Sequence, residues 1–159
     1  MNEWLAVAPH AQIIHGIIGC RVSIDDMADR PTRVSSNGDV LDLGGRHVRF
    51  IDTPHVPHGW DAGVIYEEDT ATLFCGDLFT HGGNPPALTT SDILAPAIAT
   101  EGAVGYTSLT PNTAPIIHSL ATLAPKTLAV MHGSSFKGDG GAALTGLANH
   151  YAARLHAAL

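Results

Sequence analysis

The stretch Thr53-Pro54-His55-Val56-Pro57-His58-Gly59-Trp60-Asp61 is a histidine-rich turn that leads into two apolar strands. The second of these strands ends at Cys75-Gly76-Asp77-Leu78-Phe79, and a later apolar strand ends at Leu128-Ala129-Val130-Met131-His132-Gly133. An imidazole, a carboxylate and another imidazole are therefore each expected where a strand gives way to a loop. This donor set suits a divalent metal such as zinc or iron. It is the only constellation in the sequence that indicates chemistry.

The chain around this stretch alternates turns with short apolar runs. Residues 39–43 and 46–51 flank a Gly-Gly pair, and residues 63–66 and 72–75 flank a second turn, which predicts two β-hairpins. Further strands are predicted at residues 12–16 and 127–131. Helices are predicted at residues 2–9, 110–125 and 141–159, the second of them with Thr110 as N-cap before Pro111. Residues 19–38 are expected to form a loop, and residues 80–109 to form the wall of a cleft.

Composition limits the functional classes that remain. The 159 residues are 45% apolar and only 14% charged, which indicates one domain with a real core and argues against disorder. A net charge of −7 and a pI of about 5.7 exclude nucleic acid and anionic membranes as expected partners. The chain has no basic start of a signal peptide and only two cysteines, so we expect a cytoplasmic protein with reduced thiols.

The histidines differ in how well they fit a metal site. His55 and His58 share one turn that two prolines stiffen, and one of the two is expected to be a ligand. His81 lies four residues after Asp77 and is a candidate to line the same cleft, where it would contact the substrate or support a metal ligand. Cys75 is interpreted as a small core residue inside a strand. The remaining histidines are interpreted as surface or packed side chains: His10, His15, His47, His118, His150 and His156.

These motifs together resemble the second half of the metallo-β-lactamase fold, in particular its flavodiiron and oxygen-binding diiron branch. Members of that branch place a histidine three residues before an aspartate in this turn, as His58 stands before Asp61, and the 19-residue step from His58 to Asp77 also suits them. The resemblance implies that Asp77 bridges two metals and that His58 and His132 each hold one. His55 is the alternative first ligand. The implied cofactor is a dinuclear iron or zinc centre, and the implied partner is a small-molecule substrate or dioxygen.

The sequence departs from this family in one respect. The His-x-His-x-Asp-His or His-x-Glu-x-Asp motif that precedes the first helix of the fold does not occur in the chain. We therefore expect an α/β fold, with residues 1–159 forming a single, incomplete domain that corresponds to the C-terminal part of a metallo-β-lactamase-like αββα sandwich.

Three functions remain open from the sequence. The first is a metal-dependent hydrolase or a diiron oxygen-binding oxidoreductase, impaired by the loss of the first metal-binding motif. The chain would be an enzyme only if the complete site exists. The second is a non-catalytic structural or binding module, possible also as a homo-oligomer that covers an open sheet edge. The third is a mononuclear zinc hydrolase that uses His58, Asp77 and His132 and leaves one position for water.

Overall fold

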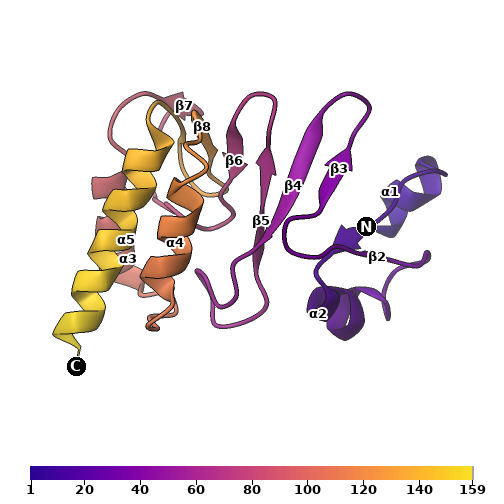
Figure 1. Ribbon diagram of the computed structural model, residues 1–159, viewed down its shortest axis with the longest axis horizontal. Helices are drawn as coiled ribbons and strands as arrows, with labels where there is room; N and C mark the ends of the chain where they lie inside the picture. Colours follow the sequence, from indigo (N-terminus) through magenta and orange to yellow (C-terminus); the bar gives the residue numbers. More distant parts are fainter. Residues whose placement is uncertain (159) are drawn as a thin grey trace.

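The two predicted hairpins form, and they build one half of a seven-stranded sheet in the computed structural model, which describes residues 1–158 (Figure 1). β3 (Val40–Asp42) pairs antiparallel with β4 (His47–Asp52), and β5 (Gly63–Glu67) pairs antiparallel with β6 (Thr72–Phe74). The turn between β3 and β4 holds both of its glycines at positive φ. Glycine adopts this conformation without steric cost, so the Gly-Gly pair directs the hairpin.

The other half of the sheet joins strands that are distant in sequence. β8 (Thr127–Ala129) lies parallel to β6, β9 (Ser135–Lys137) lies antiparallel to β8, and β7 (Leu88–Thr89) lies parallel to β9. The strand order is β3-β4-β5-β6-β8-β9-β7. Because β5 is antiparallel to β4 and to β6, the strands β4, β6 and β8 all run in the same direction. The loops that follow these three strands therefore emerge at the same end of the sheet.

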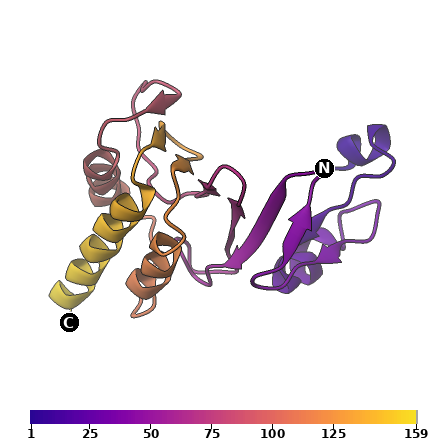
Figure 2. The same cartoon turned by 45° about the horizontal axis from the view of Figure 1, so that its top comes forward.

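Helices cover one face of the sheet on the C-terminal side of the molecule. α3 (Leu94–Val104), α4 (Thr113–Ala121) and α5 (Gly140–Ala157) lie together there (Figure 2). Their apolar side chains meet the face that carries Val64, Leu73 and Leu128. α5 begins at Gly140 because Asp139 caps it, accepting a hydrogen bond from the Ala142 amide at 2.8 Å. The fully buried side chains of this core include Ile117, Leu120, Leu144 and Leu147.

The N-terminal segment lies at the opposite end of the molecule from α5 (Figure 1). It contains α1 (Asn2–Val7), α2 (Ile17–Gly19), the π-helical turn η1 (Cys20–Ile24) and a two-stranded parallel sheet of β1 (Ile14–His15) and β2 (Arg33–Val34). Only Leu5 of α1 is buried. The guanidinium of Arg30 donates to the carbonyls of Leu5, Ala8 and Ala11 at 2.5–3.1 Å. α1 buries little apolar surface. The hydrogen bonds from Arg30 therefore hold α1 and the residues that follow it in place.

Several boundaries predicted from the sequence were wrong. Residues 19–38, expected as a loop, contain η1 and β2, and residues 80–109 contain β7 and α3. α4 begins at Thr113 rather than at Pro111. The hydroxyl of Thr110 accepts from the Asn112 amide at 3.2 Å, so it closes a turn before the helix instead of capping it. The predicted end of the last helix, Leu159, lies outside the described residues.

The second face of the sheet carries an apolar row with little cover. The register places Phe50 opposite Ile65, Ile65 opposite Phe74, and Phe74 opposite Ala129. Ile65 is 42% exposed and Phe74 is 49% exposed. A sheet that buries one face only normally presents polar side chains on the other, so this row is an uncovered apolar surface.

The architecture is mixed α/β, as the sequence predicts. Within residues 1–158, no helix has the length and apolar character needed to cross a membrane.

Candidate metal centre

Three of the predicted site residues meet at the end of the sheet where β4, β6 and β8 stop. His58 lies in the loop after β4, Asp77 lies just beyond β6, and His132 lies just beyond β8. Nε2 of His58 lies 2.7 Å from Oδ2 of Asp77, and Nε2 of His132 lies 3.2 Å from Oδ1 of Asp77. The carboxylate therefore presents one oxygen to each imidazole. The two imidazole side chains are 51% and 60% exposed, so solvent reaches the group freely.

A depression of about 330 Å³ surrounds this group. Its lining combines the three site residues with Thr80, Val104 and Tyr106. Burial raises the pKa of the Tyr106 hydroxyl, which lies 3.4 Å from the main-chain oxygen of Asp77. The prediction that residues 80–109 form a cleft wall is confirmed for these three residues. Tyr106 was not predicted individually, because it follows an unrecognised helix and belongs to no motif.

His55 lies apart from this group although it shares the turn with His58. It adopts a positive φ of 62°, and its amide donates to the Trp60 carbonyl at 2.9 Å. Its side chain is exposed and lines a separate depression with Ile18 and Trp60. Of the two histidines in the turn, the structure thus places His58 beside Asp77. Asp61 points elsewhere and accepts from the Gly19 amide at 3.0 Å.

His81 is buried and does not line the depression. Its Nδ1 lies 2.8 Å from the Phe79 carbonyl, and its Nε2 lies 2.9 Å from the amide of Ser134. Since the amide can only donate, Nε2 accepts and the ring proton is assigned to Nδ1. The His81 amide also donates to the carbonyl of His132 at 2.8 Å. His81 therefore joins the loop of Asp77 to the loop of His132.

Gly133 is required by this contact. A Cβ at Gly133 would lie 2.4 Å from the His81 ring, and the residue has a φ of +129°. Both the space and the backbone conformation exclude a side chain there. The glycine after His132 thus allows the two loops to approach each other.

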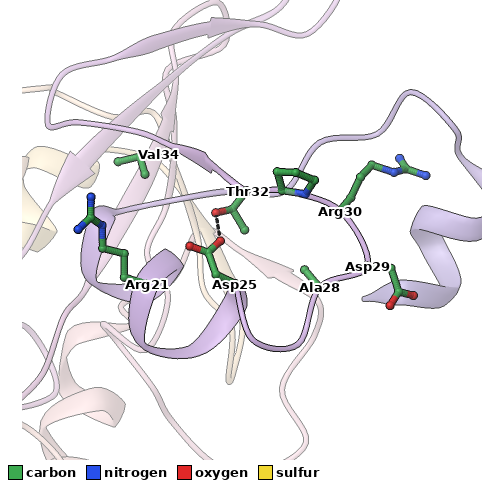
Figure 3. Close-up of a pocket in the computed structure, with 8 residues that line it drawn as sticks. Arg21, Asp25, Ala28, Asp29, Arg30, Thr32 and Val34 are labelled. Atoms are coloured by element: carbon green, nitrogen blue, oxygen red, sulfur yellow. Dashed lines mark hydrogen bonds between the residues drawn. The ribbon is translucent and has the colours of Figure 1, made fainter.

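A larger depression lies elsewhere, beside η1 and β2, and has a volume of about 510 Å³ (Figure 3). Two of its charged side chains, Arg30 and Asp25, are already engaged. Arg30 binds main-chain carbonyls of the N-terminal segment, and the Asp25 carboxylate accepts from the Thr32 hydroxyl. Figure 3 shows the side chains of Arg21 and Arg30 extending in different directions rather than toward a common point. The depression lacks convergent donors, so the smaller one around Asp77 is the better candidate site.

The donors suit a metal in kind but not in number. Two imidazole nitrogens and a carboxylate are ligands that both zinc and iron accept. Within the described part of the chain, however, no group of three or more His, Cys, Asp or Glu side chains is arranged to hold a metal ion. The imidazoles instead contact the carboxylate directly and face different oxygens. The three side chains thus bring donor atoms of the right kind together, two imidazole nitrogens beside the two oxygens of one carboxylate.

The chain resembles solved flavodiiron structures over almost its whole length. Rubredoxin:oxygen oxidoreductase from Desulfovibrio gigas superposes with a TM-score of 0.72 at 19% identity, over 94% of this chain and 40% of that chain. A flavoprotein from Thermotoga maritima gives a TM-score of 0.68 at 25% identity, over 93% and 37%. The apo form of a chemotaxis sensor from T. denticola gives 0.71 at 20% identity, over 92% and 62%.

The chain has a partial metallo-β-lactamase-like fold. Within that fold its structural neighbours are flavodiiron proteins, as the sequence motifs predict. It spans less than two thirds of the length of each of the three solved chains described above. No family model matches the sequence, and no curated protein matches it either.

Proposed function

We propose that this chain contributes Asp77, His58 and His132 to a diiron centre that reacts with dioxygen. One observation carries the proposal: the Asp77 carboxylate presents a separate oxygen to each imidazole, at 2.7 Å and 3.2 Å. Asp77, His58 and His132 would hold such a centre, since carboxylate oxygens and imidazole nitrogens are donors that iron accepts. Further ligands for such a centre would come from outside the described residues.

Iron is preferred over zinc because of the proteins that share the fold. Their names refer to oxygen reduction, to flavodiiron proteins and, for another state of the chemotaxis sensor, to a diiron species. When bound, iron would supply the electron-transfer chemistry with dioxygen.

The residues of this chain would bind the metal and orient the side chains that hold it. Asp77 would neutralise positive charge at the centre, and the imidazoles of His58 and His132 would hold the metal. His81 keeps the loops of Asp77 and His132 together through two hydrogen bonds, and a third to the Phe79 carbonyl orients its ring. The open depression admits a small substrate without rearrangement, since half or more of each imidazole side chain is exposed.

The test is anaerobic loading with ferrous iron, followed by exposure to dioxygen. We expect the native chain to bind iron and to oxidise it faster than free iron under the same conditions. Asp77→Ala should abolish this effect, whereas Asp69→Ala, at an exposed carboxylate in the turn between β5 and β6, should not. Equal oxidation rates in the native chain and in Asp77→Ala would refute the proposal.

A second candidate is a metal-free binding module. It is favoured by the direct contacts of both imidazoles with the Asp77 carboxylate. In that case the contacts of Asp77 with the two imidazoles would hold the three loops together by themselves. Asp77→Ala would then lower the unfolding midpoint, while the native chain would retain no iron after desalting.

A further inference from the structure

Glu101 is a buried carboxylate that the proposed site does not use. It lies on α3 and its side chain is 1% exposed. Arg154 of α5 donates to its Oε1 at 2.7 Å, and the hydroxyls of Thr107 and Tyr151 lie 2.8 Å and 3.5 Å from its Oε2. Burying a carboxylate is costly unless its charge is paired and its oxygens are hydrogen-bonded. The ion pair with Arg154 and the two hydroxyl contacts meet both conditions here. We therefore asked what the buried carboxylate holds in place.

The bond to Thr107 links Glu101 to the segment that follows α3. Gly105 ends this helix in the left-handed conformation, with φ 66° and ψ 47°, and turns the chain toward the site. Thr107 comes two residues later, and its hydroxyl lies 2.8 Å from both the Glu101 carboxylate and the Tyr151 hydroxyl. Glu101 therefore fixes the position of this segment relative to α3 and α5.

The same segment contacts the turn that carries His58. The carbonyl of Tyr106 lies 3.4 Å from Nδ1 of His58, and the two rings meet edge to face with centroids 6.1 Å apart. The Ser108 amide donates to the Pro57 carbonyl at 2.6 Å. Within the described residues, the His58 ring has two hydrogen-bond partners, namely the Tyr106 carbonyl and Asp77. A metal at Nε2 would replace the contact with Asp77, and the Tyr106 carbonyl would then orient the ring.

We propose that Glu101 is a positioning residue for His58, acting through Thr107 and Tyr106. The expected effect of Glu101 on metal binding rests on the proposed function. The expected effect of Glu101 on the orientation of the His58 ring does not. A histidine ligand needs a partner for its second nitrogen, because that partner sets the orientation of the ring. The Tyr106 carbonyl is this partner, and the bond between Thr107 and the buried carboxylate holds the carbonyl in place.

The competing explanation is that Glu101 only joins α3 to α5. Two matched variants separate the explanations, since each removes one hydroxyl from the same buried cluster. Thr107→Val cuts the link toward Tyr106, whereas Tyr151→Phe changes the cluster on the side of α5. Thr107→Ser restores the hydroxyl and serves as the conservative rescue. Should Thr107→Val not fold, Glu101→Gln removes the charge with little change of shape and takes its place.

Two readouts are measured on each folded variant. The first is the proton and nitrogen resonances of the His58 ring in the metal-free protein. The second is the affinity for zinc ions alone, measured by competition with a chelating dye. For Thr107→Val we expect shifted His58 resonances and a loss of zinc affinity of about 10- to 100-fold, the usual effect of losing such an outer partner. Tyr151→Phe should change both much less, and Thr107→Ser should match the native protein.

The results can refute the inference and the proposed function separately. If Thr107→Val and Tyr151→Phe lower the unfolding midpoint alike and leave the His58 resonances unchanged, Glu101 only stabilises the helix packing and the inference fails. If the His58 resonances shift but even the native chain binds no zinc, the positioning role stands and the proposed metal centre fails.

Discussion

Substituting the uncovered apolar row of the sheet should change self-association without unfolding the chain. Ile65 and Phe74 are neighbours across β5 and β6 and are 42% and 49% exposed. Fully burying such a side chain contributes about 1.5–3 kcal/mol. Since each is already about half covered, covering the rest gains roughly 1 kcal/mol per side chain. Two copies that join through this face would then gain about 4 kcal/mol from these four side chains.

That gain is comparable with the lower end of the entropic cost of association, which is about 4–15 kcal/mol. The four side chains alone therefore only offset that cost. The weak, concentration-dependent self-association that we expect of the native chain requires the rest of the row, including Phe50, to be covered as well. The double variant Ile65→Thr/Phe74→Thr should weaken it by about 4 kcal/mol, which is about a thousandfold in the association constant. The variant should remain folded because threonine suits a strand, but its unfolding midpoint should fall, since the covered half of each side chain also loses contacts.

Sedimentation velocity over a wide concentration range measures this effect. Val22→Thr is the matched control, because Val22 is a comparably exposed apolar residue on η1, away from the sheet. A native chain that remains monomeric at every concentration would refute the reasoning. Equal association constants for the double variant and the control would refute it as well, since another surface would then be responsible.

Three further predictions follow from single contacts. Gly133→Ala should lower the free energy of unfolding by on the order of 1–3 kcal/mol in denaturant titrations, because the backbone conformation and the His81 ring both oppose a Cβ; an unchanged midpoint would contradict this placement of His81. Burial raises the pKa of the Cys75 thiol to about 12. A thiol reagent at mildly alkaline pH should therefore label Cys75 only at the rate of global unfolding. Rapid labelling of the native state would contradict the burial of this thiol. Arg30→Ala should release α1, which limited proteolysis would detect as early cleavage before residue 14 with α3–α5 intact; cleavage patterns identical to those of the native chain would show that other contacts hold α1.

The strands that end at site residues were predictable because each motif is local. Gly44 and Gly45 direct one hairpin, and Gly76 permits the backbone turn before Asp77 with a φ of +55°. The meeting of His58, Asp77 and His132 follows from strand direction, since β4, β6 and β8 are parallel. Their order in the sheet depends on a pairing between β6 and β8 across some fifty residues, which no local pattern specifies.

Other features were hidden from the sequence for physical reasons. α3 was missed because it has a proline in its first turn and buries only Ala97 and Glu101 along 11 residues, so no apolar stripe marks it. β9 has three residues and gains its place only by pairing with β8. His81 follows Asp77 closely in sequence, which suggested a place in the cleft. Its ring nitrogens instead lie against main-chain groups of two loops, a bonding pattern that appears only once the loops have met.

The most direct test of the metal centre compares the two histidines of one turn. His58→Ala and His55→Ala remove the same side chain three residues apart, and only His58 lies beside Asp77. Equilibrium titration with ferrous iron or zinc should show fewer than two metals bound per chain, and His58→Ala should weaken binding by at least about tenfold. His55→Ala should bind as the native chain does. A larger loss from His55→Ala, or native binding that survives His58→Ala, would contradict the assignment of this site.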